Sequence, residues 1–391
     1  MNYITVQEAA VRWGISERRV QMFCREGRVS GALKHNGTWH IPEDAPRPEN
    51  PRENAKKRYA RLLPMPLMNT AFTPGRAADI VKKIKDPRQR DIATAELYYF
   101  SGHAEAAAFF TEPYLDEPEP ALRLSASLIF AYANLALGQI QRVRQALAAV
   151  QDILSELDDD APENLRAAAV FVVTTASVLL HLPLPEHFPD LRRFMSALPA
   201  GLRQFALYVQ AHRTYLDGDY ARSLGIVEAA FAIEQEKYPI PSIYLHLVAV
   251  MNAVSIKDIA LAEKHLLAAW RLAQPDDLIE PFGEHHGLLG GMLEAVIKPQ
   301  WPGDFKRIID ITYRFSAGWR RIHNPDTGHD VADNLSTTEF AICMLAARDW
   351  SDREIADHLG LSVHTVKHHL SNAYSKLGIK GRKGLKDYML L

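Results

Sequence analysis

The sequence has little of what marks secreted, membrane or cysteine-metal proteins. Its 391 residues include only two cysteines, Cys24 and Cys343, which excludes a disulfide framework and a cysteine-rich zinc site. No apolar run approaches the ~18 uncharged residues of a membrane-spanning helix. The first residues do not have the basic and apolar regions of a secretory signal. We therefore expect a cytoplasmic protein that makes no membrane contact.

Several catalytic motifs are also missing from the sequence. It contains no G-x-x-x-x-G-K-[ST] phosphate loop, no H-E-x-x-H metalloprotease motif and no G-x-S-x-G nucleophile elbow. The alternating strand and helix pattern that would open a phosphorylated receiver domain is absent too. These absences indicate a protein that is not an enzyme and needs no metal or other cofactor.

Charge is distributed unevenly along the chain. Residues 1–61 carry a formal charge of +5, and residues 335–391 carry +2 together with four histidines. Because the whole chain carries −2, the segment between them carries −9. Two basic ends that flank an acidic middle would suit termini that bind a polyanion, although a charge run is often only a solvated face.

Residues 1–46 have the pattern of a winged helix-turn-helix. Thr5 and Glu8 are spaced as a capping box, and Ser16 is placed to cap a second helix that ends near residue 26. Asn36-Gly37 lies between two strand-like runs, which predicts a tight β-hairpin. In a helix-turn-helix, the second helix enters the major groove of DNA.

The elements T-x-x-E-A-A, G-I-S, R-x-V-Q and G-x-W-x-I-P resemble excisionase-like and MerR-like DNA-binding domains over roughly residues 3–46. The resemblance implies that the second helix reads DNA and that the wing tip approaches the DNA backbone or minor groove. Arginine can pair with guanine or phosphate, and glutamine can pair with adenine. The alternative is that the arginines only keep a small domain soluble. The DNA-binding candidates are Ser16, Arg18, Arg19, Gln21, Arg25, Lys34 and His35.

Residues 331–391 carry the most specific pattern of the chain. Ser336 and Glu339 form a second capping-box spacing. Helices are expected over 352–359, over 363–377 after a cap at Ser362, and from about 383 to 390. Apolar residues recur at helical spacing and predict one small core. They are Ile355, Ala356, Leu359, Val366, Leu370, Tyr374 and Leu377.

The stretch S-D-R-E-I-A-D-H-L-G-L-S-V-H-T-V-K-H-H-L-S-N-A-Y-S-K-L-G-I-K-G-R resembles the LuxR-type (GerE or NarL-like) four-helix DNA-binding domain. The resemblance implies that helix 363–377 reads DNA, with Lys367 and His368 toward the bases and Thr365 near phosphate. It also implies that the last helix pairs two copies, so we expect a homodimer. For the final three basic candidates the alternative is charge compensation at a helix end. The candidates are His364, Thr365, Lys367, His368, Ser371, Lys376, Lys380 and Arg382.

Residues 75–330, which follow a predicted linker over 47–74, are helical in pattern. Short breaks at positions 102, 138, 218 and 257 are 36, 80 and 39 residues apart, and the interval of 80 accommodates two units. This period resembles the tetratricopeptide repeat and predicts an α-solenoid. A solenoid offers a surface for a peptide, a partner helix or a small ligand, and the alternative is a scaffold or dimerisation role.

One local feature of the middle segment could form a ligand pocket. Its candidate residues are Glu284, His285, His286, Phe315 and Trp319. Adjacent residues of a helix point ~100° apart, so two neighbouring histidines are poorly placed to bind one metal ion. Histidines hydrogen-bonded within a helix crossing are the alternative.

These patterns predict a mainly α protein. Its α-solenoid core carries an N-terminal winged helix-turn-helix with a small β-hairpin and a C-terminal four-helix helix-turn-helix. The predicted function is a sequence-specific transcription regulator that binds double-stranded DNA and senses a small-molecule or peptide effector through its core. The alternative is an interaction scaffold whose terminal heads bind protein.

Overall fold

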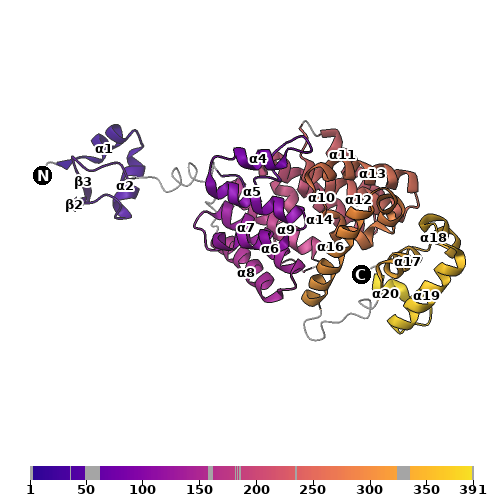
Figure 1. The fold of residues 1–391 in the computed structure, drawn as a ribbon. Helices are drawn as coiled ribbons and strands as arrows, with labels where there is room; N and C mark the ends of the chain where they lie inside the picture. Colours follow the sequence, from indigo (N-terminus) through magenta and orange to yellow (C-terminus); the bar gives the residue numbers. More distant parts are fainter. Residues whose placement is uncertain are drawn as a thin grey trace. The chain divides into compact units, whose positions relative to one another are not determined.

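The computed structural model describes residues 3–35, 37–48, 62–156, 162–180, 182, 184, 186–233, 236–323 and 335–389, with the side chains of 154–156, 319–323 and 387 left out. The chain divides into two compact units, residues 1–61 and residues 62–391 (Figure 1). Within the described part of the chain, none of the helices combines the length and the apolar character that a membrane span needs.

The described part of the first unit contains two short helices and a small antiparallel sheet in the order β1-β3-β2. The predicted capping box is present, since the Thr5 hydroxyl accepts from the Glu8 N–H at 3.2 Å and the Glu8 carboxylate accepts from the Thr5 N–H at 2.7 Å. Ser16 is the N-cap residue of the second helix, as predicted, but its side chain accepts no hydrogen bond from the helix N–H groups. The elements are β1 (Tyr3–Ile4), α1 (Val6–Trp13), α2 (Glu17–Arg25), β2 (Leu33–His35) and β3 (Thr38–Pro42).

The core of the second unit is built from helices that pack in consecutive pairs. The pairs turn at residues 102, 138, 218 and 257, where the breaks were predicted. Three of these positions are glycines with positive φ, but Lys257 adopts the same left-handed conformation with φ 65°. The paired helices are α5 (Pro87–Phe100), α6 (Ala104–Thr111), α7 (Pro120–Ala136), α8 (Ile140–Glu156), α10 (Ala200–Leu216), α11 (Tyr220–Ile233), α12 (Pro239–Ser255) and α13 (Ile259–Ala273). The other elements are α4 (Ala77–Lys83), η1 (Glu112–Tyr114), α9 (Glu163–Leu179), η2 (Leu191–Ala197), η3 (Gln274–Asp276), α14 (Glu280–His285), η4 (His286–Leu289), the π-helical turn η5 (Leu293–Ile297), α15 (Lys298–Gln300) and α16 (Pro302–His323).

The inner helices of the array are covered on both sides. Helices α7 and α12 are buried along almost their whole length, because α8 and α13 pack on one side while α16 and α14 pack on the other. The approach of α16 to α7 is so close that a Cβ added at Gly318 would lie 1.8 Å from the Leu135 carbonyl oxygen. Much of the inner surface expected to receive a ligand is therefore filled by the chain's own helices.

The predicted linker over 47–74 extends too far. Residues 62–74 belong to the second unit, where Met65, Leu67 and Met68 are buried. The N–H groups of Leu67 and Met68 donate to the Glu96 carboxylate at 2.8 and 2.9 Å, which satisfies backbone that burial removes from water. Apolar side chains at these positions pack into the core instead of spacing two domains.

The C-terminal head of the second unit, residues 335–389, has the predicted helix order. The Ser336 and Glu339 capping box is confirmed, as are the bounds of the two helices that follow. The last predicted helix begins as a 3₁₀ turn and continues as an α-helix to Met389, the last described residue. The elements are α17 (Thr337–Ala347), α18 (Asp352–Leu359), α19 (Val363–Leu377), η7 (Arg382–Leu385) and α20 (Lys386–Met389).

Candidate nucleic-acid interface

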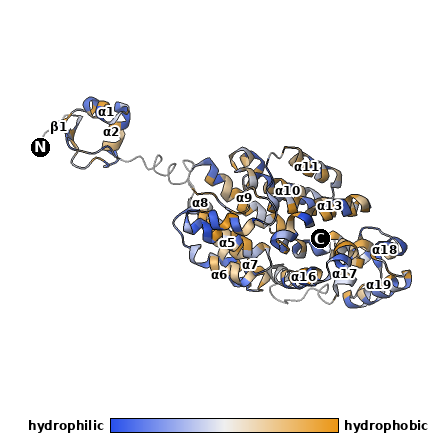
Figure 2. Ribbon diagram, turned by 45° about the horizontal axis from the view of Figure 1, so that its top comes forward, coloured by the Kyte–Doolittle hydropathy of each residue, from blue (hydrophilic) through white to orange (hydrophobic). Residues whose placement is uncertain are grey.

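Helix α19 is held in place by its caps and by one apolar stripe. The Ser362 hydroxyl accepts from the Thr365 N–H at 3.0 Å, and Gly378 ends the helix with φ 66°. Figure 2 shows hydrophilic and hydrophobic residues around the same helix, as an amphipathic helix requires. The buried stripe consists of Val366, Leu370, Ala373 and Leu377.

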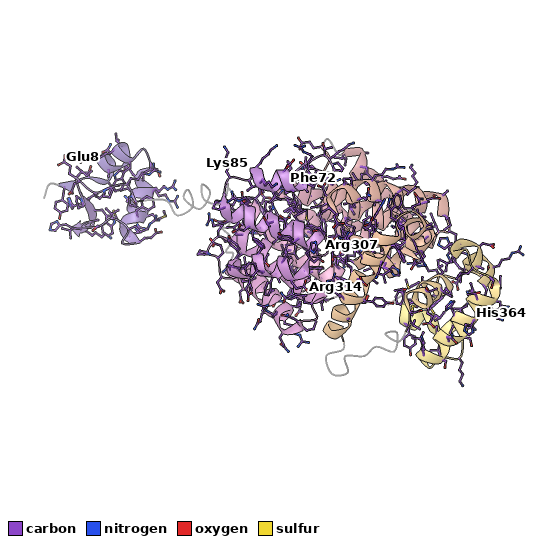
Figure 3. All side chains as sticks on the ribbon, in the orientation of Figure 1. Glu8, Phe72, Lys85, Arg307, Arg314 and His364 are labelled. Carbon is purple, nitrogen blue, oxygen red and sulfur yellow. The ribbon has the colours of Figure 1, made fainter. Side chains whose placement is uncertain are left out.

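The opposite side of α19 is open to solvent. His364, Lys367, His368 and Ser371 are exposed, whereas Thr365 is half-buried and its hydroxyl lies 2.8 Å from that of Ser362. His368 pairs with the Asn372 amide at 3.2 Å, one turn later. Figure 3 shows His364 at the edge of the head that points away from the helical core. The four exposed residues present one permanent positive charge and several hydrogen-bonding groups.

Two of the predicted phosphate-binding cations are engaged inside the head. Lys376 donates to Glu339 at 2.7 Å, which joins the end of α19 to the start of α17. Partial burial opposes ionisation of Glu339, but hydrogen bonds from Lys376 and Ser336 outweigh it and lower the Glu339 pKa. Arg382 donates to the Asp352 carboxylate and to the Trp350 carbonyl. A phosphate contact by Lys376 or Arg382 would have to compete with these bonds.

Lys380 differs from Lys376 and Arg382. Its side chain is exposed, and none of the described residues forms an ion pair or hydrogen bond with it. Lys367 on α19 is also exposed, and none of the described residues forms an ion pair or hydrogen bond with its side chain. These two lysines are the cations of the predicted C-terminal site that are available to bind phosphate or bases.

The head packs on the helical core through α17 and α18. The Arg348 guanidinium, which is buried, donates to the Tyr215 hydroxyl and to the Leu288 carbonyl. Lys257 donates to the Glu354 carboxylate at 3.0 Å, and His358 Nε2 lies 3.0 Å from the Gly290 carbonyl oxygen. The exposed side of α19 takes no part in these contacts, so the core leaves the predicted reading surface free.

The glycine-rich segment of the core explains this close packing. A Cβ added at Gly287 would lie 2.3 Å from the Phe340 ring, and one at Gly291 would lie 2.4 Å from the Leu359 side chain. Glycine is required at both positions while the head is docked. The segment directly follows Glu284, His285 and His286, and nothing in its sequence indicated that it would pack against the C-terminal head.

In the first unit, most of the predicted DNA-binding residues form an exposed surface on α2 and β2. Arg19 is half-buried, and the Lys34 ammonium lies 5.8 Å from the centre of the Trp39 ring. The buried residues of α2 are Val20, Phe23 and Cys24. The exposed candidates are Ser16, Arg18, Gln21, Arg25, Lys34 and His35.

The side chains predicted to line a pocket at 284–286 each bind a different partner. Glu284 accepts from the Tyr99 and Tyr244 hydroxyls. The imidazole ring of His285 forms two hydrogen bonds. Its Nε2 lies 2.8 Å from the Tyr208 hydroxyl, and its Nδ1 lies 2.7 Å from the Pro281 carbonyl oxygen.

His286 has a different partner, because its Nε2 lies 2.8 Å from the Glu294 carboxylate. Phe315 is buried in α16, and the side chain of Trp319 lies outside the described residues. Across the described part of the chain, no group of three or more His, Cys, Asp or Glu side chains is arranged to hold a metal ion. The segment is a helix crossing stabilised by separate hydrogen bonds.

We predict that Glu284→Gln makes the stability of the protein less dependent on pH. Burial raises the Glu284 pKa to about 7, against hydrogen bonds from two tyrosines that lower it. The folded protein therefore keeps a proton that the unfolded chain loses near pH 4.5, so this group makes unfolding easier as pH rises from about 4.5 to 7.

The glutamine amide stays neutral at every pH. The substitution should therefore remove a decrease in the free energy of unfolding on the order of 1–3 kcal/mol between pH 5 and pH 8. Urea denaturation at both pH values measures the difference. Glu105→Gln, at an exposed position of α6, is the control. An unchanged pH dependence in Glu284→Gln would refute the burial of a protonated carboxyl.

Comparison with known proteins identifies the C-terminal head. Residues 333–389 match the family "Bacterial regulatory proteins, luxR family". The chain is 39% identical over 54 residues to "Probable transcriptional regulatory protein SgaR" of Hyphomicrobium methylovorum, which is 14% of this chain and 26% of that protein. It is 44% identical over 48 residues to "Spore germination protein GerE" of Bacillus subtilis (strain 168), which is 12% of this chain and 65% of that protein. No solved structure matches the chain.

The family match covers residues 333–389, which belong to the head. The chain spans less than two thirds of either relative. Residues 333–389 are a LuxR-family helix-turn-helix domain, which implies DNA-binding transcriptional regulation. The resemblances predicted for the N-terminal unit and for the helical core stay predictions.

Proposed function

We propose that this protein is a sequence-specific transcription regulator that binds double-stranded DNA through the exposed side of α19. The observation that carries the proposal is the surface of His364, Lys367, His368 and Ser371, which stays open to solvent while the head is packed on the core. An α-helix fits the major groove, and lysine recognises guanine there.

The rest of the chain suits a composite regulator. Arg18, Gln21 and Arg25 on α2 provide a second helix with groups that pair with bases and phosphates. The helical core, similar in period to tetratricopeptide repeats, is the part that senses a small-molecule or peptide effector. Pairing of the final helix of two copies would make the protein a homodimer and double the number of DNA-binding surfaces.

The test is duplex binding by the full chain at a series of salt concentrations. Each phosphate neutralised by a lysine or arginine contributes about −0.9 to the slope of log affinity against log salt. We expect a steep negative slope, and we expect Lys380→Ala to make it about one unit shallower on every duplex. A flat dependence, or no binding to any duplex, would refute the proposal.

The second candidate function is an interaction scaffold whose heads bind protein. It is favoured by the internal bonds of Lys376 and Arg382, which engage two of the four cations predicted to bind DNA in the C-terminal head. The salt series distinguishes the two functions, because a scaffold has no phosphate contacts to lose.

A further inference from the structure

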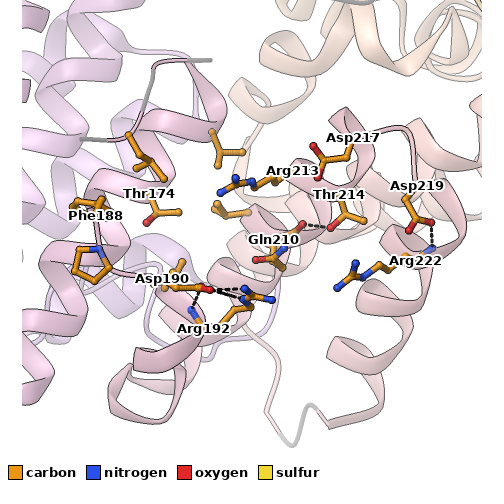
Figure 4. Close-up of a pocket in the computed structure, with 15 residues that line it drawn as sticks. Thr174, Phe188, Asp190, Arg192, Gln210, Arg213, Thr214, Asp217, Asp219 and Arg222 are labelled. Atoms are coloured by element: carbon orange, nitrogen blue, oxygen red, sulfur yellow. Dashed lines mark hydrogen bonds and ion pairs between the residues drawn. The ribbon is translucent and has the colours of Figure 1, made fainter. Parts of the chain in front are cut away.

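A cavity of about 480 Å³ lies beside helices α9, α10 and α11. It is remote in sequence from both DNA-binding candidates and from the pocket predicted at 284–286. Figure 4 shows that Arg192, Arg213 and Arg222 extend toward the same space from η2, α10 and α11. The volume falls within the range of small-molecule sites in proteins.

Two of the three guanidinium groups have no partner in the described structure. Arg192 is bound by Asp190, whose carboxylate accepts its Nε at 2.8 Å. Arg213 and Arg222 line the cavity and are exposed, and no described residue forms an ion pair or side-chain hydrogen bond with either of them. A planar guanidinium is suited to bind a carboxylate through two parallel hydrogen bonds.

The wall of the cavity also includes a hydroxyl group, that of Thr174, without a hydrogen-bond partner. Thr174 is 7% exposed, and its hydroxyl has no hydrogen-bond partner. Burial of an unpaired hydroxyl is unfavourable, so a ligand or water that bonds to it is expected. The wall also includes the polar residues Gln210 and Thr214 and six apolar residues, which are Val178, Leu184, Phe188, Pro189, Leu191 and Val209.

Acidic residues that line the cavity cancel the positive charge of its arginines. Asp217 and Asp219 also line the cavity, and the Asp219 carboxylate accepts from the Arg222 backbone N–H at 3.1 Å. The three aspartates balance the three arginines, so the cavity has no excess positive charge to attract anions from a distance. Affinity must come from direct contact with Arg213 and Arg222.

We propose that this cavity binds a small organic carboxylate with an apolar chain. The carboxylate would bind Arg213 and Arg222, and the chain would pack against Leu184 and Phe188. The role of this ligand as an effector rests on the proposed function, but its binding does not. An inorganic anion would make no use of the apolar residues of the wall, and a neutral lipid would make no ion pair with the arginines.

The experiment uses the full chain and two probes that differ only at one end, hexanoate and hexanamide. Ligand-observed NMR titration gives the dissociation constant of each. We expect hexanoate to bind at least ~10-fold more tightly than hexanamide, which corresponds to about 1.4 kcal/mol. Arg213→Gln and Arg222→Gln should each weaken hexanoate binding by a similar factor and leave hexanamide unaffected.

Arg203→Gln is the matched control, because Arg203 is exposed on the same helix α10 but does not line the cavity. It should bind hexanoate as the unmodified chain does. Circular dichroism of each variant establishes that it is folded. Equal affinity for the two probes, no hexanoate binding up to ~10 mM, or an equal loss in Arg203→Gln would each overturn the proposal. DNA binding enters none of these measurements, so a failure here is separate from a failure of the proposed function.

Discussion

Lys367→Ala weakens binding of the full chain to its preferred duplex by ~10- to 100-fold, because a lysine that pairs with guanine in the major groove contributes about 1–3 kcal/mol of discrimination. Lys367 is exposed on the reading side of α19 and has no partner among the described residues. Its removal takes away the permanent charge of that surface. The loss should be largest on the preferred duplex and small on unrelated duplexes.

Two control variants separate base reading from simple loss of charge. Lys264→Ala removes an exposed lysine of α13 in the core and should leave DNA affinity unchanged. Lys380→Ala should weaken binding to all duplexes by a similar factor, as a phosphate contact does. Fluorescence anisotropy with preferred and unrelated duplexes measures all three variants. If Lys367→Ala and Lys380→Ala had the same effect on every duplex, Lys367 would be a phosphate contact and would not read a base.

Gly318→Ala destabilises the helical core by about 1–3 kcal/mol or more, since overpacking of a dense interior forces the backbone to move. The added methyl group would lie 1.8 Å from the Leu135 carbonyl oxygen and 2.7 Å from its carbonyl carbon. Neither atom can move without a shift of helix α7. Because α16 and α14 together cover the inner helices, the separation of α16 from α7 would loosen the whole array.

Gly303→Ala is the matched control in the same helix. A Cβ at Gly303 meets no atom within 4 Å, and alanine favours a helix over glycine by about 0.5–1 kcal/mol. The two variants should therefore change the midpoint of thermal unfolding in opposite directions. Equal midpoints for Gly318→Ala and the unmodified chain would show that α16 does not pack against α7 at this distance.

Local signals in the sequence predicted the elements of both heads well. Ser336, Glu339 and Ser362 cap helices through hydrogen bonds between residues three apart, and Gly378 supplies a left-handed end. These interactions depend on the nearest neighbours in the chain, so their spacing is visible in a single sequence. The same reasoning found the turns at 102, 138 and 218, where glycine has positive φ.

Interactions between distant residues could not be predicted in this way. Arg348 and Tyr215 are 133 residues apart, and nothing near either residue indicates that they meet. Lys257 adopts the left-handed backbone conformation that glycine adopts at the other turns. Its side chain also binds Glu354 of the head, which its place in a turn does not indicate. The apolar run at 62–68 did carry a signal, because it places five leucine or methionine side chains in a proposed linker, and three of them, Met65, Leu67 and Met68, are buried.

The partners of the residues predicted to line a ligand pocket could not be read from the sequence for a related reason. Glu284, His285 and His286 were grouped because their side chains are polar and adjacent in sequence. Adjacent helical residues face different neighbours, and each of the three found a separate partner. The cavity beside α9, α10 and α11 is lined by arginines from η2, α10 and α11, which share no local sequence pattern.

The most direct test of the account is selection of duplexes from a random pool by the full, unmodified chain. The exposed side of α19 predicts enrichment of one defined sequence, with affinity for that sequence well above the affinity for the starting pool. Retention of the pool without enrichment, or no retention even at low salt, would contradict the claim that this surface reads DNA.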